Sequence, residues 1–254
     1  MYAVFSLPCL LFVRERKRKR AGKRSIASLS TDAVKQLWLT ACAVRDHSDV
    51  VRLLAGRFLY VDSLAVVITY MTVYLSRMGG FTEAEKNLVL ALSVVFAVIG
   101  GFSIGFIADR LGPKRVLLTV LLIFSIALGV AGGTGAAWAV WIIGPVVGIG
   151  LAAVWTCDRL FMMRITPPAA RGEFFGIYNL VGKVGGAIGP GIWGITVWYA
   201  SHRLDWNLFD ASRLALVVMV LPTLLGALII MGLSDAPRDW SGDRLERDLE
   251  GMHA

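Results

Sequence analysis

Two charged residues lie inside stretches of the chain that are otherwise almost entirely apolar. Lys183 stands in the segment 182–194, "GKVGGAIGPGIWG", and Asp62 stands in the apolar segment 58–76. A charge at the centre of a lipid bilayer costs at least about 2.5 kcal/mol, so it is expected to face a partner, water or a bound solute. The chemistry open to these two side chains is binding of an ionic or zwitterionic solute, or exchange of a proton.

The segments that must position these residues are long enough to cross a membrane. A helix needs about 20 apolar residues to span the hydrocarbon core, whereas the strands of a membrane β-barrel would alternate and run for about 10 residues. Of the 254 residues, 56% are hydrophobic, and the mean hydropathy is +0.66. The sequence therefore predicts an all-α, polytopic bundle of six transmembrane helices, over residues 53–76, 87–108, 116–133, 137–161, 174–199 and 214–233.

The distribution of Lys and Arg gives the expected orientation. The run "RERKRKRAGKR" (14–24) holds eight of the 26 basic residues. The segments 14–50, 109–115, 159–171 and the C-terminal tail carry 10, 3, 3 and 3 of them, while 77–86 and 201–213 carry two each. Basic connections are typical of the cytoplasmic side, so both ends of the six-helix block are expected there.

The chain is expected to divide into four parts. Residues 1–13 resemble the last part of a transmembrane helix, and 14–50 form a basic cytoplasmic loop with a short amphipathic helix. Residues 51–233 form the six-helix bundle, and 234–254 form a cytoplasmic tail. The histidines fall outside the predicted spans and no metal-ligand or catalytic motif is present, so we expect neither an enzyme nor a cofactor or metal.

Glycines recur at helical spacing on the segment that holds Lys183. Gly182, Gly186 and Gly189 fall at i, i+4 and i+7, and Gly185 pairs with Gly189 in a second small-x-x-x-small pattern. Such patterns let membrane helices approach closely, and Pro190 is expected to bend the helix just beyond them.

The segment "GFIADRLGPKR" (105–115) is the most specific motif. Its pattern resembles the loop signature of the major facilitator superfamily, found between helices two and three and often again between helices eight and nine. Its residues are expected to act as a gate: Gly105, Asp109, Arg110, Gly112, Lys114 and Arg115. Basic residues after the turn can bind helix-end carbonyls or a neighbouring carboxylate.

Several further stretches narrow the resemblance. "LPCLLFVRERKRKR", "FLYVDS" (58–63), "PPAARGEFFGIYNLVGK" (167–183) and "GAIGP" (186–190) resemble the vacuole-effluxer branch, the autophagy-related amino-acid effluxers and their bacterial relatives. The resemblance implies the second half of a twelve-helix transporter: the end of helix six, the central loop and helices seven to twelve. A partner six-helix half is then expected, on the same longer chain or on another.

The resemblance also places helices seven and eleven near each other. Asp62 and Lys183 each lie about ten residues into a helix that starts at the cytoplasm, so an Asp62–Lys183 pair is expected. The pair would either fix the helix register or bind solute and exchange a proton. The neighbouring candidates for solute binding are Asn179, Thr69, Tyr70 and Trp155. Asp158 and Arg159 lie lower and are expected to close the inner mouth.

The predicted function is secondary active transport of a small solute, by analogy amino acids, through alternating access. The alternative is a truncated or non-transporting membrane subunit that requires a second six-helix half. The expected partners are the lipid bilayer, the solute and that second half, but no nucleic acid. The location would be the inner (plasma) membrane in a bacterium or the vacuolar membrane in a fungus.

Overall fold

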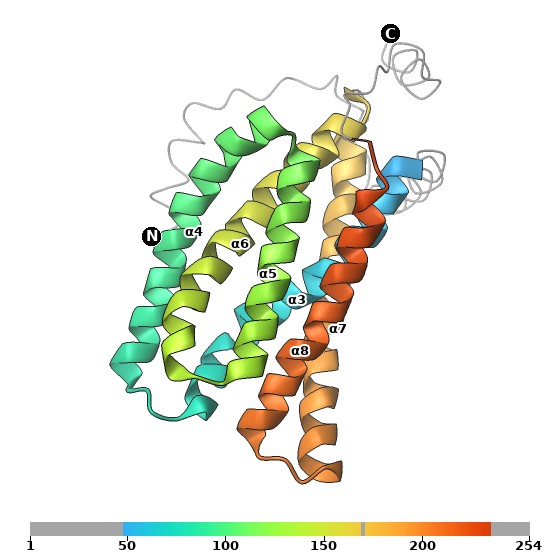
Figure 1. Cartoon of the computed structure of the whole chain (residues 1–254). Helices are drawn as coiled ribbons and strands as arrows, with labels where there is room; N and C mark the ends of the chain where they lie inside the picture. The colour runs from blue at the N-terminus through green and yellow to red at the C-terminus, as the bar shows by residue number, and fades with distance from the viewer. Residues whose placement is uncertain (1–47, 169–170, 235–254) are drawn as a thin grey trace, which may run out of the picture. The chain divides into compact units, whose positions relative to one another are not determined.

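The computed structural model describes residues 48–168 and 171–234, which contain six long helices (Figure 1). Each helix is long and apolar enough to cross a membrane, which confirms the predicted all-α bundle. The helices are α3 (Ser48–Met78), α4 (Glu83–Leu111), α5 (Pro113–Thr134), α6 (Ala137–Ile165), α7 (Arg171–Arg203) and α8 (Leu208–Met231). The predicted helix end at 1–13, the amphipathic helix of the basic loop and the tail beyond Ser234 lie outside the described residues.

Several helices extend beyond the apolar segments from which they were predicted. α3 starts at Ser48, five residues before the expected start of the span, and α7 runs for 33 residues. Charged residues such as Arg52 delimit the apolar segment but do not end the helix, because arginine is a good helix former. Every depth counted from the apolar boundaries is therefore shifted along the helix.

The ends of the helices carry recognisable stop and start signals. Thr82 and Glu85 form a capping box at the start of α4, and the side chain of Asn207 accepts a hydrogen bond of 2.8 Å from the N–H of Asp210 at the start of α8. Gly112, with φ of +90°, is the single residue between α4 and α5. A positive φ at this value strains any residue with a Cβ atom, so the turn requires glycine.

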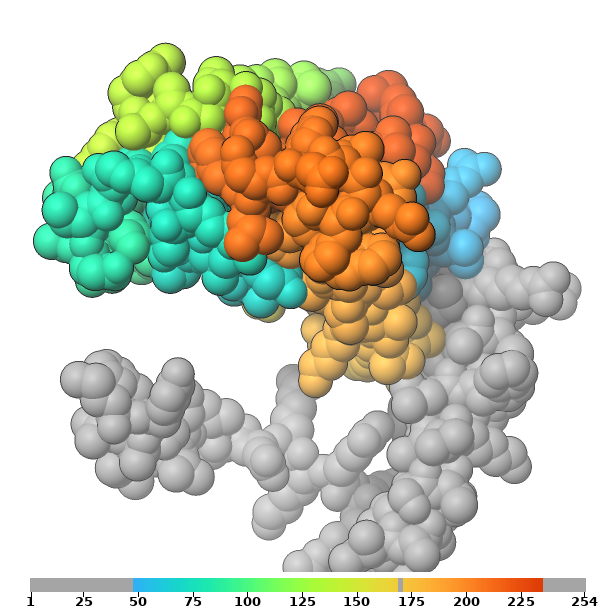
Figure 2. Space-filling view, turned by 90° about the horizontal axis from the view of Figure 1, so that it is seen from below, coloured from blue at the N-terminus to red at the C-terminus, as the bar shows by residue number. Residues whose placement is uncertain are grey.

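The six helices alternate in direction, so their connections gather at two ends of the bundle. The start of α3, the α4–α5 and α6–α7 connections and the end of α8 lie at one end, the upper one in Figure 1. The α3–α4, α5–α6 and α7–α8 connections lie at the other end, which Figure 2 views directly. Both ends of the block 48–231 therefore face the same side, and the charge distribution predicts that side to be the cytoplasm.

The pattern of helix packing repeats within the block. α3 packs against α7 and α8, α6 packs against α4 and α5, and α5 packs against α8. If α3 is made equivalent to α6, α4 to α7 and α5 to α8, each of these contacts corresponds to another contact in the set. Such a pattern is typical of transporters built from two three-helix repeats.

Glycines bring the backbones of α3 and α7 into direct contact. A Cβ atom at Gly185 would lie 2.9 Å from the carbonyl oxygen of Phe58, and one at Gly189 would overlap the backbone of Asp62. A glycine also brings the backbones of α4 and α6 into contact, because a Cβ atom at Gly148 would overlap the backbone of Ser93. These two contacts correspond to each other under the repeat described above.

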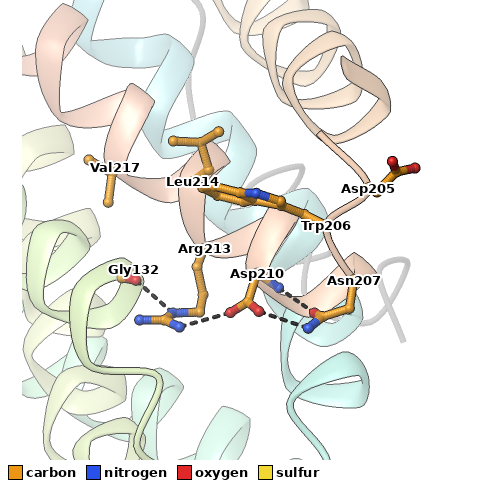
Figure 3. A pocket seen from close by; sticks show the side chains of 8 residues that line it. All are labelled: Gly132, Asp205, Trp206, Asn207, Asp210, Arg213, Leu214 and Val217. Atoms are coloured by element: carbon orange, nitrogen blue, oxygen red, sulfur yellow. Dashed lines mark hydrogen bonds and ion pairs between the residues drawn. The ribbon is translucent and has the colours of Figure 1, made fainter. Parts of the chain in front are cut away.

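The antiparallel helices α5 and α8 are joined by a basic side chain at each end. Lys114, at the start of α5, donates to the carbonyl oxygens of Met231, at 2.9 Å, and Leu233. Arg213, near the start of α8, donates to the carbonyl oxygens of Gly132, at 2.8 Å, and Gly133 (Figure 3). The last carbonyls of a helix lack partners within the helix, so each base satisfies the exposed end of its neighbour.

The topology predicts opposite labelling at the two ends of the bundle. In a background without the native cysteines, Ala84→Cys at the start of α4 should react with a membrane-impermeant maleimide in intact bacterial cells, because this end is predicted to be external. Gly172→Cys, where a Cβ atom meets no neighbour within 4 Å, should react only after the cells are opened. The reverse pattern would show that the orientation is wrong.

The close contact of α7 with α3 predicts a large difference between two glycines only two residues apart. Gly189→Ala should destabilise the protein by about 1–3 kcal/mol, because its Cβ atom would overlap the backbone of Asp62. Gly191→Ala is the matched control, since nothing lies within 4 Å of its Cβ position, and it should be neutral. Thermal unfolding of both variants in detergent measures this, and equal melting temperatures would refute the contact.

Candidate functional site

Asp62 is buried in the contact between α3 and α7. Asp62 is only 3% exposed, and its Oδ1 atom accepts a hydrogen bond of 3.1 Å from the backbone N–H of Gly189. The residue of α7 opposite Asp62 is therefore Gly189, which lies six residues after Lys183. Asp62 and Lys183 were expected at equal depth, but they are about 9 Å apart along the helix axis.

The structure does not bring Asp62 and Lys183 together as an ion pair. Arg57 of α3 forms a salt bridge with Asp158 of α6, and the residue of α7 whose backbone N–H binds Asp62 is Gly189. The extension of the helices explains only part of this offset, because α3 starts five residues and α7 three residues before its predicted span. The rest of the offset is a shift of α7 along α3, which places Gly189 opposite Asp62. Lys183 is instead exposed on this six-helix block.

The other candidates for solute binding are divided between exposed and packed positions. Asn179, one turn before Lys183 on α7, and Thr69 on α3 are exposed. Tyr70 stacks on Trp193 of α7, with ring centroids 5.1 Å apart. Lys183 and Asn179 thus share an open side of α7, whereas Tyr70 is tied to the packing of α3 against α7.

Trp155 lines an apolar cavity of 510 Å³ between α3, α4 and α6. Trp155 is 45% exposed, and the polar side chains of Thr72 and Ser93 also contribute to the lining. The residues that line the cavity come from α3, α4 and α6, and none comes from α7. The sequence groups Trp155 with Lys183, but Lys183 is not among the residues that line this cavity.

A charged cluster joins α3, α6 and α7. Asp158 is completely buried, forms an ion pair with Arg57 and accepts a hydrogen bond of 3.0 Å from the hydroxyl of Tyr178. The guanidinium carbon of Arg57 lies 3.6 Å from the centroid of the Tyr178 ring, a cation–π contact. We refer to Arg57, Asp158 and Tyr178 as the three-helix cluster.

The three-helix cluster gives Asp158 a different setting from the expected one. Asp158 and Arg159 were predicted to close the inner mouth together, but only Arg159 is exposed. Arg57 and Tyr178 were not predicted as site residues. The signal for Arg57 is present in the sequence, because it lies within the predicted span 53–76 and a charge there requires a partner.

The motif 105–115 surrounds the turn between α4 and α5. Asp109 and Arg110 are exposed at the tip of α4, and Arg115 is exposed at the start of α5. Lys114 binds the carbonyls at the end of α8, which is the helix-end contact that the sequence suggested. Gly105 lies within α4, which continues to Leu111, and no described atom lies within 4 Å of its Cβ position.

The opposite end of the bundle holds a second pocket, of 540 Å³ (Figure 3). Arg213 forms an ion pair with Asp210, and Asn207 caps the start of α8 by hydrogen bonds to Asp210. Trp206 and Leu214 complete its wall. The side chains of Asn207, Asp210 and Arg213 bind one another or the end of α5 (Figure 3), so their role is to hold helix ends.

The fold resembles that of solved membrane transporters. An inward-open structure of the xylose transporter XylE from E. coli matches with a TM-score of 0.63, at 16% identity, over 81% of this chain and 55% of that one. A bacterial homolog of the human lysosomal transporter Spinster, in an inward-facing conformation, matches with a TM-score of 0.60, at 17% identity, over 89% of this chain and 55% of that one.

Relatives in sequence agree with the fold. The uncharacterized MFS-type transporter YxiO of Bacillus subtilis is 24% identical over 95% of this chain and 53% of its own length. Autophagy-related protein 22 of Coccidioides immitis is 25% identical over 80% of this chain and 37% of its own length. The chain therefore spans about half or less of the length of these relatives.

The six helices, their repeated packing and the motif 105–115 define one six-helix half of a major facilitator fold. The family model described as "Vacuole effluxer Atg22 like" matches residues 1–229. The chain thus belongs to the vacuole effluxer Atg22-like family, which confirms the resemblance drawn from the sequence.

Proposed function

We propose that this chain is the second six-helix half of a secondary active transporter, which carries a small solute across the membrane by alternating access. Its fold and family support this function, since its relatives include an MFS-type transporter and its solved neighbours are transporters. Because those proteins are about twice as long, the complete transporter is expected to include a second half.

The exposure of the helices supports a second half on one particular side. In the most apolar window of α4, 11% of residues are buried, and in that of α7, 22%, against 39–56% in the other four helices. In Figure 2, α4 and α7 lie along one side of the bundle, and α5 and α8 lie along the other. We expect the partner half to cover the side formed by α4 and α7.

Lys183 is the observation that carries the transport proposal. It is a cation twelve residues into the spanning helix α7, and it is exposed on the described block beside Asn179. A cation at this depth requires water, a counter-charge or an anionic group of a solute. A water-filled cavity between two halves would supply the water, and the carboxylate of a solute would supply the anionic group.

Amino acids are the solute class that fits this site best. The family is described as vacuole effluxers, and Lys183 with Asn179 offers a cation and an amide to a carboxylate. The membrane would be the plasma membrane in a bacterium and the vacuolar membrane in a fungus. The exposed tip residues Asp109 and Arg110 would control the exchange between the two access states.

Removing the charge of Lys183 should strongly reduce transport but preserve the fold. In proteoliposomes containing the complete transporter, Lys183→Met should reduce exchange of labelled amino acids about tenfold or more, as expected for loss of a charge-assisted contact. Arg203→Gln is the matched control, because Arg203 is an exposed base at the outer end of the same helix. A wild-type protein that exchanges no solute would instead favour a non-transporting membrane subunit.

Asp109→Asn should separate the transport rate from solute binding. Asp109 is exposed at the tip of α4, remote from Lys183, so its loss should slow exchange while leaving the equilibrium affinity for the solute unchanged. Isothermal titration of the purified transporter, together with the exchange assay, measures both quantities. An equal decrease in affinity and rate would contradict the gating role.

A further inference from the structure

The three-helix cluster is not used by the proposed contacts with solute. It lies deeper than the motif 105–115: Asp158 is seven residues before the end of α6, or about 10 Å along the helix. Arg57 is only 8% exposed and Asp158 is completely buried. An ionised pair in this position requires an explanation, because buried ion pairs contribute little to stability compared with apolar packing.

Several polar atoms at the cluster have no hydrogen-bond partner among the described residues. They are Oδ1 of Asp158, Nε of Arg57 and the hydroxyl of the neighbouring Tyr60, all of them buried. Buried polar groups are almost always satisfied, either by protein or by ordered water. An acceptor, a donor and a hydroxyl together fit a guest that both donates and accepts hydrogen bonds, which is water.

The same set of atoms does not fit a metal cation. The charge of Asp158 is already balanced by Arg57, and only one of the unpartnered atoms is a carboxylate oxygen. Hard cations take several oxygen ligands and would be repelled by the guanidinium. The ion that the cluster can accept without displacing Arg57 is a proton on Asp158.

Asp158 is the carboxylate that faces the cluster, whereas Asp62, further along α3, binds the N–H of Gly189. Arg57 and Tyr60 face Asp158 from α3, Tyr178 from α7, and Cys157 and Arg159 flank it on α6, where Arg159 also interacts with Tyr178. α4 and α5 also pack on α6, but their charged residues at this end, Asp109, Arg110, Lys114 and Arg115, lie at the helix tips. α8 carries no acidic or basic residue beyond Arg213.

The geometry points to Asp158 as the proton-coupling carboxylate of the transporter, with Arg57 and Tyr178 as its positioning residues. A proton from water enters Asp158 at Oδ1, which neutralises the carboxylate and removes the counter-charge of Arg57. Arg57 keeps its contact with the Tyr178 ring, so the ionic tie between α3 and α6 is lost while α3 stays joined to α7. Release of the proton restores the ion pair. This inference rests on the transport function proposed above.

Asp158→Asn separates proton coupling from solute transport. Asparagine keeps the acceptor for the Tyr178 hydroxyl and resembles the protonated acid. With the complete transporter in proteoliposomes, the variant should retain solute exchange when no pH gradient is present. It should lose both the accumulation of solute driven by a pH gradient and the proton movement that a pH-sensitive dye reports on addition of solute. Asp205→Asn, an exposed acid at the outer end, should behave as wild type in all three assays.

Three outcomes would overturn the inference. A variant that still accumulates solute under a pH gradient would show that Asp158 is not the coupling group. Wild-type transport that is indifferent to the pH gradient would refute coupling while leaving the proposed function intact. Wild-type protein that exchanges no solute would refute both proposals.

Two further variants keep the inference testable if Asp158→Asn fails to fold. Arg57→Met combined with Asp158→Asn removes the stranded cation, and this double variant should fold and show exchange without accumulation.

Tyr178→Phe removes one hydrogen bond to the carboxylate, and this variant should shift the pH at which exchange is half-maximal. A double variant that accumulates solute, or that folds and exchanges none, would contradict the coupling role, as would an unchanged pH profile for Tyr178→Phe.

Discussion

Helices in lipid gain nothing from hiding apolar surface, because the hydrocarbon around them is as apolar as their own side chains. Close contact between backbones therefore decides how this bundle is arranged. α7 reaches α3 through Gly185 and Gly189, and α6 reaches α4 through Gly148, at separations that no larger residue allows. The burial of Asp62 against Gly189 follows from the close contact of α7 with α3.

Hydrogen bonds and a salt bridge in the core join α3 to other helices. Ser63 donates a hydrogen bond of 2.7 Å to the carbonyl oxygen of Met219 on α8, and the hydroxyl of Tyr74 donates one of 2.7 Å to Ala131 on α5. Arg57 joins α3 to α6 and α7. α3 thus contacts four other helices through polar groups or glycines. A change in the charge of Asp158 therefore acts on α3, the helix that makes these contacts.

The number and type of helices could be predicted, because each span is a long apolar run and lipid permits few alternatives to a helix. The contact of Lys114 with a helix end could also be anticipated from the motif. The partner of Asp62 could not, because counting residues along each helix does not give the shift of α7 along α3 that places Gly189 opposite Asp62. The pairing of Arg57 with Asp158 depends on how three helices cross, which no local pattern in the sequence specifies.

One feature of the α4–α5 turn has a mechanical consequence. Gly112 alone connects the two helices, and the next residue but one, Lys114, is fixed to the end of α8. The connection has no slack to absorb displacement of the tip of α4. A tilt of α4 must therefore displace α5 and α8 with it, so the turn transmits movement from the exposed side of the bundle to the opposite side.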